Sequence, residues 1–270
     1  MNPSETTKLA AQIRRATLEM VHRVDASHVG GGLSMTDLLA VLYTEILRVD
    51  PAQPAWPDRD RFILSKGHAC AALYATLALR GFFPVEELLT YGRDGSRLMA
   101  HVSYKVPGAE FSTGSLGHGL PFGCGRALAA KRMGRGWRVF VMLSDGELDE
   151  GSNWEAILFA PQHRLDNLVA IVDYNQIQSL GNVSDILELG PLADKFRAFR
   201  WTVREVDGHN HEAVRTALTG LPWEPGKPSC LIAHTVKGKG VSFMENQLPW
   251  HYKSPNAEQL RKALSELGAE

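Results

Sequence analysis

Apolar residues recur at helical spacing through the first third of the chain. Every third or fourth position is apolar in several segments, which is typical of amphipathic helices. Four helices are expected here, at residues 5–24, 35–47, 68–81 and 84–95. Ser34 directly precedes the second of them and is expected to cap it, and Gly81 is expected to end the third.

The middle and end of the chain show a different pattern, in which continuous apolar runs alternate with helical segments. The runs have strand length, and they lie at residues 62–65, 138–143, 167–174 and 229–236. Residues 153–164 and 211–220 lie between these runs and predict helices, as do the last residues, 255–270. Strands that are apolar on both faces and alternate with helices predict an α/β fold, a doubly wound and mainly parallel sheet with helices on both faces. Such sheets bind ligands at the carboxyl ends of their strands, beside a topological switch point.

Composition narrows the functional classes. The 270 residues include 29 basic and 30 acidic side chains, so the net charge of −1 does not favour nucleic-acid or membrane binding. The chain begins with an amphipathic segment that has no apolar signal core, and no stretch approaches the roughly 20 apolar residues that span a bilayer. Its three cysteines are far apart and are expected to be reduced core residues of a cytoplasmic protein.

Four carboxylates follow the predicted strand at 138–143, in the segment SDGELDEG (144–151). Asn175 follows the next strand in the same way. Carboxylate, amide and carbonyl oxygens are the ligands that Mg²⁺ prefers, and Gly146 would let the backbone approach a ligand closely. An Asp-Gly turn and a loop Asn are common without any metal, so these residues alone leave both interpretations open.

Several ordered blocks then extend the pattern over residues 8–265. They are SHVGGGLSMTDLLAVLY (27–43), DRDRFILSKGHACAALYATLALRGFF (58–83), STGSLGHGLPFGCGRALAAK (112–131), SDGELDEGSNWEA (144–156) and HTVKGKGVSFMEN (234–246). In this order they resemble the transketolase family. The similarity is greatest to the N-terminal, diphosphate-binding subunit of transketolases that are split into two chains.

The resemblance implies a thiamine diphosphate cofactor bound through Mg²⁺ or Ca²⁺. Asp145 and Asn175 match the side-chain metal ligands, and Ile177 matches a position that offers its backbone carbonyl. Gly146 matches a backbone donor to the diphosphate, and Ser144 replaces the first glycine of the family's signature as a spacer. The cofactor-binding positions implied in this way are His68, Gly114, Ser115, Leu116, Gly146, Asn175, Ile177 and His251.

The resemblance also implies a set of catalytic residues. They are His28, His68, His101, Glu150 and His251. The histidines match positions that line the cofactor and substrate channel, where an imidazole can donate, accept or relay a proton. Glu150 matches a proton-relay carboxylate at a subunit boundary, whereas Glu147 and Asp149 are interpreted as favourable charges at a helix start.

Three residues depart from the family at positions that we expect to flank the substrate entrance. Val29 and Val102 follow histidines where Pro is usual, and His118 stands where Gln is common. The departures leave the cofactor unaffected and leave the identity of the sugar open.

On this resemblance, residues 1–270 form a single thiamine diphosphate-binding domain with an N-terminal helical segment and a C-terminal helix. The pyrimidine-binding domain is absent and is expected on a separate C-terminal subunit, in an α2β2 heterotetramer. Together the two chains would act as a transferase, moving a two-carbon ketol unit from a ketose or ketose phosphate to an aldose. The chain alone would be inactive.

Three other interpretations stay open. A 2-oxo acid dehydrogenase alpha-type or carboligase subunit shares the Asp-Gly and Asn pattern, but it is not expected to carry the SKGH and TGSLGHG blocks; a 1-deoxyxylulose-5-phosphate synthase is usually one longer chain. A non-catalytic regulatory or scaffold subunit would keep the fold but has no need for Asp145 together with Asn175.

Overall fold

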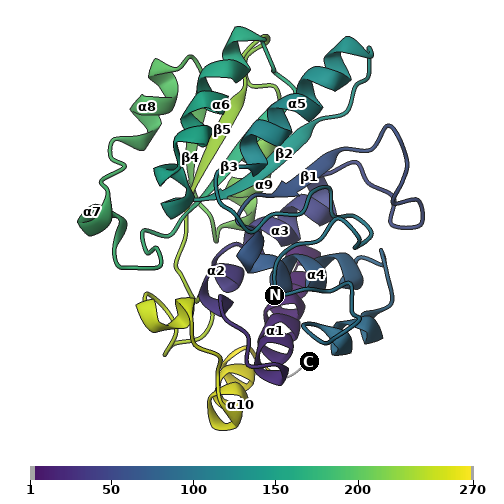
Figure 1. Cartoon of the computed structure of the whole chain (residues 1–270), viewed down its shortest axis with the longest axis vertical. Coiled ribbons are helices and arrows are strands. Elements are labelled where there is room, and N and C mark those ends of the chain that lie inside the picture. Colours follow the sequence, from purple (N-terminus) through teal and green to yellow (C-terminus); the bar gives the residue numbers. More distant parts are fainter. Residues whose placement is uncertain (1–3, 269–270) are drawn as a thin grey trace.

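Five parallel strands form the centre of the molecule, in the order β1-β2-β3-β5-β4 (Figure 1). This computed structural model describes residues 4–268, so the ends of the predicted 1–270 domain and 255–270 helix lie outside the described residues. The strands are β1 (Arg61–Leu64), β2 (Val139–Ser144), β3 (Leu168–Tyr174), β4 (Thr202–Asp207) and β5 (Ser229–His234). The predicted doubly wound parallel sheet is confirmed. The apolar pattern of the sequence does not predict β4, because this edge strand is only partly buried and carries charged residues instead of an apolar run.

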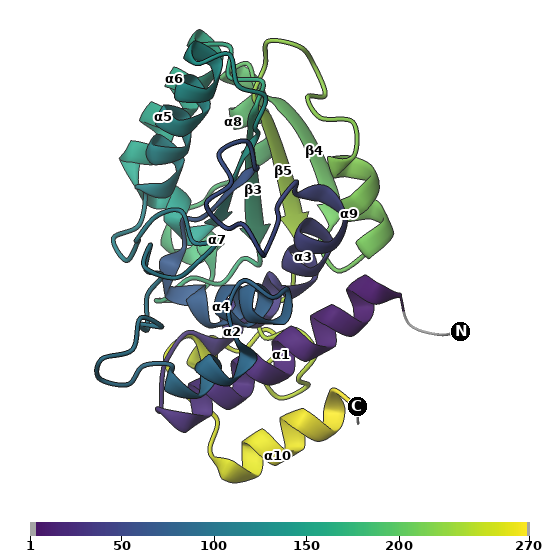
Figure 2. The same ribbon diagram turned by 90° about the vertical axis from the view of Figure 1, so that its right-hand side faces the viewer.

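Helices cover both faces of the sheet, because residues along each strand alternate between two hydrophobic clusters. In β2, Phe140 and Met142 join one cluster, whereas Val139, Val141 and Leu143 join the other. The first cluster is covered by α1 (Glu5–Arg23), α3 (Thr36–Val41), α4 (Cys70–Leu79) and α9 (His211–Leu218). The second is covered by α5 (Gly119–Arg132), α6 (Gly151–Gln162) and α8 (Leu192–Ala198) (Figure 2).

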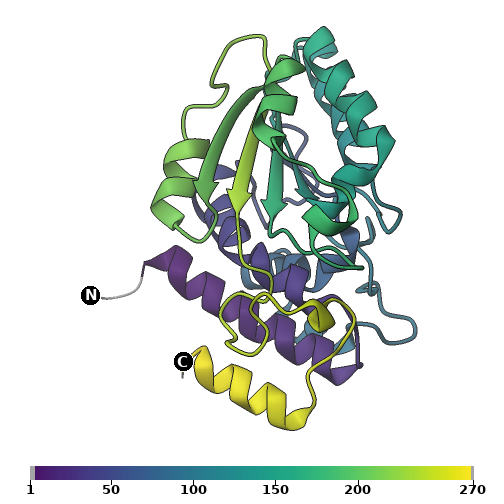
Figure 3. The ribbon, with the colours of Figure 1, turned by 90° about the vertical axis from the view of Figure 1, so that its left-hand side faces the viewer.

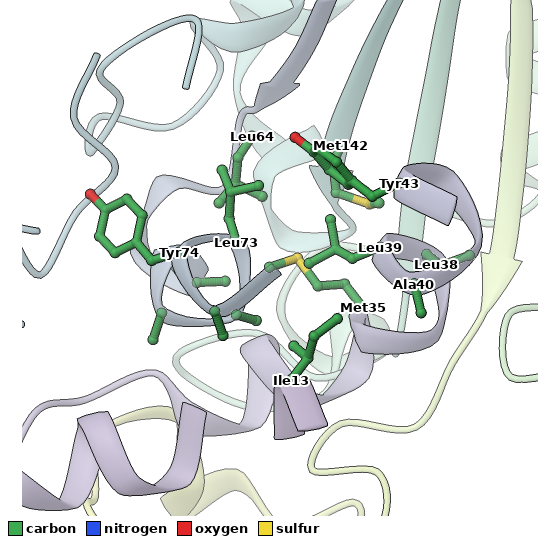
Figure 4. Close-up of a cluster of buried hydrophobic side chains, with 14 of the residues drawn as sticks. Ile13, Met35, Leu38, Leu39, Ala40, Tyr43, Leu64, Leu73, Tyr74 and Met142 are labelled. Atoms are coloured by element: carbon green, nitrogen blue, oxygen red, sulfur yellow. The ribbon is translucent and has the colours of Figure 1, made fainter. Parts of the chain in front are cut away.

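The first cluster is the larger of the two and holds the N-terminal helices against the sheet. Ile13 of α1, Leu39 of α3 and Leu73 of α4 meet Leu64 and Met142 from the strands (Figure 4). All five are buried, and truncating such a side chain to Ala costs about 2–5 kcal/mol. The early helices are therefore an integral part of the core.

The second predicted helix begins differently from the expectation. Ser34 is the last residue of α2 (Val29–Ser34) and does not cap α3. Its hydroxyl instead donates to a carboxylate oxygen of Asp173 at 2.5 Å. The side chain that the local sequence predicts as a helix cap is therefore bound to a buried carboxylate from another part of the chain. The helix expected at 35–47 continues from α3 as a π-helical turn over Leu42–Ile46.

Short elements complete the chain. The helix expected at 84–95 is a 3₁₀ helix over Val85–Thr90. The others are the 3₁₀ helices η2 (Gly67–Ala69), η4 (Gly146–Asp149) and η5 (Leu248–His251), and the α-helices α7 (Val183–Ile186) and α10 (Ala257–Glu266).

The strand arrowheads all point toward the layer formed by α1 and α2 (Figure 3). The chain leaves β3 toward α8, on one face of the sheet, and leaves β5 toward Val241 and Met244, which belong to the cluster on the other face. This divergence of neighbouring strands creates a switch point at the carboxyl ends of β3 and β5, where doubly wound folds bind ligands.

Within residues 4–268, no helix combines the length and the apolar character that crossing a bilayer requires. Cys70, Cys124 and Cys230 are free and buried, as predicted.

Candidate active site

A cleft of about 250 Å³ lies at the carboxyl ends of the strands. Its walls come from the loops after β2, β3 and β5, together with α2, η2, η5 and the loop before α5. Residues that line it include His28, Lys66, His68, His101, Gly114, Leu116, Asp145, Gly146, Asn175, Ile177, Lys237 and His251. Most of the predicted site residues therefore meet in one cleft.

Asp145 joins the ends of β2 and β3. Its carboxylate accepts the N–H of Gly146 at 2.8 Å and the N–H of Gln176 at 2.5 Å. The second bond fixes Gln176 in the left-handed region (φ 63°), between the two other predicted ligands, Asn175 and Ile177. Asp145, at the end of β2, thus braces the turn of Asn175 and Ile177 at the end of β3, and we call this arrangement the braced turn.

The Asp145 carboxylate is 1% exposed, and no Lys or Arg of residues 4–268 forms an ion pair with it. Burial, and secondarily the nearby charge of Asp173, raises its pKa to about 6. A carboxylate held this way is stabilised by a cation, because the cation offsets both causes of the shift.

Lys237 is a cleft residue that sequence analysis missed. It is 2% exposed and follows β5 in the segment TVKGKG. Its amine donates to the carbonyl of Ile177 at 2.7 Å and lies 2.9 Å from Nδ1 of His251. Burial lowers its pKa to about 8. The sequence does carry a signal for Lys237: like Asp145, it closely follows an apolar strand, and polar residues at the carboxyl ends of such strands are candidates for ligand binding.

A second buried lysine lies near the turn of the predicted metal ligands. Lys66 and Asp173 form an ion pair whose side chains are 1% and 0% exposed. Asp173 also accepts from Ser34 and Thr235, and it faces the Asn175 amide at 3.5 Å. Although burial opposes ionisation, the Lys66 ammonium holds the pKa of Asp173 below its usual range. Two lysines and two aspartates therefore nearly balance the charge of the cleft floor.

The four predicted histidines cluster around His28. Its ring centroid lies 4.9 Å from that of His68, 5.8 Å from that of His101 and 5.1 Å from that of His251. His28 has a left-handed backbone (φ 71°), and its N–H donates to the carbonyl of His251 at 2.8 Å. This contact holds η5 against α2, although the two segments are far apart in the sequence.

Three of these imidazoles are neutral at pH 7. Burial, followed by nearby His101, lowers the pKa of His28 to about 4. Burial, followed by nearby Lys237, lowers that of His251 to about 3, and burial also lowers the pKa of His68 well below its usual value. Neutral rings can both donate and accept hydrogen bonds, as proton transfer requires.

Two of the predicted residues lie outside the lining of the cleft. In the loop before α5, Gly114 and Leu116 line the cleft, whereas Ser115 is exposed beside them. Glu150 is also exposed, at the start of α6.

The interpretation of Glu147 as a favourable surface charge at a helix start is wrong. It is 0% exposed, and its carboxylate accepts from the N–H of Gly117 at 2.9 Å and from the hydroxyl of Ser65 at 2.5 Å. It therefore ties η4 to the loop before α5 and to the end of β1. Asp149 is partly buried and accepts from the Gln178 amide at 3.2 Å.

The three family departures do not themselves line the cleft, but Val29 and Val102 each directly follow a histidine that does. Val29 and Val102 are 0% and 3% exposed and belong to the first hydrophobic cluster. They face the core because each follows a histidine that turns into the cleft. His118 is exposed at the start of α5 and lies outside the cleft lining.

Comparison with known proteins agrees with this geometry. The profile of the family "Transketolase, thiamine diphosphate binding domain" matches residues 5–270. The 6-deoxy-6-sulfo-D-fructose transketolase subunit SqwG of Clostridium sp. (strain MSTE9) is 43% identical, with 96% of this chain and 94% of that protein covered. An apulose-4-phosphate transketolase subunit from Phocaeicola vulgatus is 42% identical, with 97% and 94% covered.

A solved structure is also similar. Transketolase from Leishmania mexicana superimposes with a TM-score of 0.94 at 30% identity, over 99% of this chain and 42% of its own. The present chain thus spans less than half of that transketolase. It belongs to the transketolase family, as the thiamine diphosphate-binding part of the enzyme. The comparisons support this assignment over the other interpretations of the sequence.

Proposed function

We propose that this chain binds the diphosphate of thiamine diphosphate through a divalent cation and, with a partner subunit, transfers a two-carbon ketol unit from a ketose donor to an aldose acceptor. The observation that carries the proposal is the braced turn in which Asp145 holds the loop of Asn175 and Ile177 beside Lys237. When bound, the cofactor supplies the electron sink for breaking and forming the carbon–carbon bond.

The donor set of the braced turn fits Mg²⁺. One carboxylate of Asp145, the amide oxygen of Asn175 and the carbonyl of Ile177 are hard oxygen ligands. The Ile177 carbonyl has two lone pairs, so it can accept from Lys237 and also bind a cation. Because the cleft floor is already nearly balanced in charge, a diphosphate needs an added cation. Mg²⁺ is proposed first, and Ca²⁺ offers the same chemistry at longer distances.

The remaining residues divide according to their place in the cleft. We assign Gly146 and Lys237 to the diphosphate, with His68 and His251 beside it. We assign the backbone of Gly114, Ser115 and Leu116, a loop in which the first two residues are exposed, to the aminopyrimidine ring. His28 and His101, which line the cleft beside each other, are assigned to the sugar, where an imidazole can bind hydroxyl groups and move protons between them.

A partner subunit completes the site in this proposal. The SqwG and apulose-4-phosphate relatives are named subunits, and they act on a sulfosugar and a sugar phosphate according to those names. We infer a sugar or sugar-phosphate substrate here, with the pyrimidine-binding and C-terminal domains on a second chain in an α2β2 assembly. Glu150 is exposed and is assigned to the boundary between subunits. The described chain is one domain in this scheme, and its three buried thiols favour the cytoplasm.

Reconstitution tests the proposal. The purified chain is assayed for ketol transfer with thiamine diphosphate and Mg²⁺, alone and with the partner that we expect a neighbouring reading frame to encode. Activity should require both chains and both small molecules. Ketol transfer by this chain alone, or by the pair without thiamine diphosphate, contradicts it.

A further inference from the structure

A buried polar cluster outside the cleft surrounds the carboxylate of Asp37 on α3. The Arg14 guanidinium of α1 donates to both oxygens, at 3.0 and 2.5 Å. His209 and His211 approach the same two oxygens with ring nitrogens at 2.7 and 3.0 Å. Burial opposes ionisation of Asp37, but the two histidines and Arg14 hold its pKa well below the usual range.

The hydrogen bonds determine which nitrogen of each ring carries the proton. Nε2 of His209 accepts the backbone N–H of Val236 at 2.8 Å, so its Nδ1 carries the proton that Asp37 accepts. His211 is arranged the other way round, since its Nε2 faces Asp37 and its Nδ1 lies 2.8 Å from the hydroxyl of Thr6. Of the two histidines, it is therefore His209 that connects Asp37 to the segment after β5.

That segment carries Lys237 into the cleft. Val236 directly precedes Lys237, and the Arg14 guanidinium donates to the carbonyl of Lys239 at 3.0 Å. The cluster thus holds the backbone on both sides of Lys237. Gly238 has a left-handed backbone (φ 80°) and donates to the Gly30 carbonyl at 3.0 Å, which fixes the segment against α2.

We propose that His209, oriented by Asp37, is a positioning residue that holds the Lys237 amine at the Ile177 carbonyl. His209 does not line the cleft; it acts through the N–H of Val236. The orientation by Asp37 matters because a ring protonated at Nε2, as the other tautomer or as the imidazolium, would present N–H to the N–H of Val236, and a flipped ring would present C–H, so either change would release the segment. This inference rests on the proposed function for the role of Lys237 toward the diphosphate.

His211 provides a matched control. The two histidine side chains are 14% and 18% exposed and share one carboxylate, so removing one hydrogen bond from either perturbs the fold to a similar degree. Asn can replace the Nδ1 side of an imidazole and is too short to replace Nε2. His209→Asn therefore keeps the contact with Asp37 and loses that with Val236. His209→Gln reaches Val236 again.

The first readout is acylation of Lys237 in the full-length chain by an amine-reactive reagent at one fixed pH, quantified by peptide mass spectrometry. His209→Asn should raise the Lys237 rate about tenfold, the loss expected from one buried hydrogen bond. His209→Gln and His211→Asn should stay near the wild-type rate, with exposed Lys8 on α1 as internal reference. An unchanged rate in His209→Asn, or an equal rise in His211→Asn, overturns the proposal.

The second readout is the dissociation constant of thiamine diphosphate in the complex with the partner subunit. It should rise about tenfold in His209→Asn and not in His211→Asn. If the wild-type complex does not bind the cofactor, the proposed function fails, while the acylation rates still decide whether His209 positions Lys237. If His209→Asn labels faster yet binds the cofactor like wild type, the positioning role in the cofactor site is refuted.

Discussion

The amine of Lys237 lies 2.7 Å from the carbonyl oxygen of Ile177 and bridges the carboxyl ends of β5 and β3. The two segments leave the sheet toward opposite faces, so this bond spans the switch point where doubly wound folds bind ligands. It places a buried cation beside a turn whose oxygens are proposed to hold a metal ion.

Replacing Lys237 by Met should weaken thiamine diphosphate binding about 10- to 100-fold, because a charge-assisted hydrogen bond is lost while the apolar stem is kept. Titration calorimetry of the reconstituted complex measures the effect. Lys239→Met is the control, since the Lys239 amine pairs with Glu245 at the surface. Equal dissociation constants for Lys237→Met and wild type would remove Lys237 from the cofactor site.

Glu147→Ala should lower the free energy of unfolding by about 3 kcal/mol or more, because the buried N–H of Gly117 and the Ser65 hydroxyl lose their acceptor. Glu150→Ala should leave stability within about 0.5 kcal/mol of wild type, since Glu150 is exposed. Urea unfolding of the chain compares the two variants. Similar stabilities would restore the helix-start interpretation of Glu147.

The histidine cluster predicts acid sensitivity. The folded pKa of His28 is about 4, below the ordinary 6.5, so between these values the unfolded chain binds a proton that the folded chain does not. His28 thus contributes stability above pH 6.5 that is lost progressively as the pH falls toward 4. Between pH 7 and 4.5, the free energy of unfolding of His28→Gln should therefore fall by about 1 kcal/mol less than that of wild type. This figure includes a reduction for the partial exposure of the ring.

Urea unfolding at both pH values tests this, with His163→Gln as control because His163 is exposed at the end of α6. The same acid loss in His28→Gln and wild type, or an NMR titration of His28 centred near 6.5, would argue against a buried neutral ring.

The sequence predicts those functional residues and elements that are marked by a short local pattern. Asp145, Asn175 and the histidines were found because they stand in ordered blocks or directly after apolar runs, and the parallel sheet followed from those runs. The misinterpretations of Ser34 and Glu147 share a cause, which is that burial by distant segments leaves no local signal. From its neighbours in the sequence, Ser34 is interpreted as a helix cap, but in the structure its hydroxyl donates to Asp173 of β3. Glu147 is likewise interpreted as a charge at a helix start, but in the structure it is buried and accepts from the N–H of Gly117.

The strand β4 was missed for the opposite reason. This strand lies at the edge of the sheet and is only half-buried. Its sequence, TVREVD, therefore contains three charged residues and no apolar run that would predict a strand. Lys237 could have been found by applying the strand-end rule to every strand, since a lysine between a buried strand and two glycines is unusual for a solvated loop.

The most direct test of the central claim is calorimetry of thiamine diphosphate binding to the reconstituted complex, with and without Mg²⁺, for wild type and Asp145→Ala. The account predicts Mg²⁺-dependent binding to wild type and a loss of about 100-fold or more in Asp145→Ala, because a buried metal ligand is removed. Asp185→Ala, at an exposed carboxylate on α7, should bind like wild type. Wild-type, Mg²⁺-dependent affinity in Asp145→Ala would contradict the account.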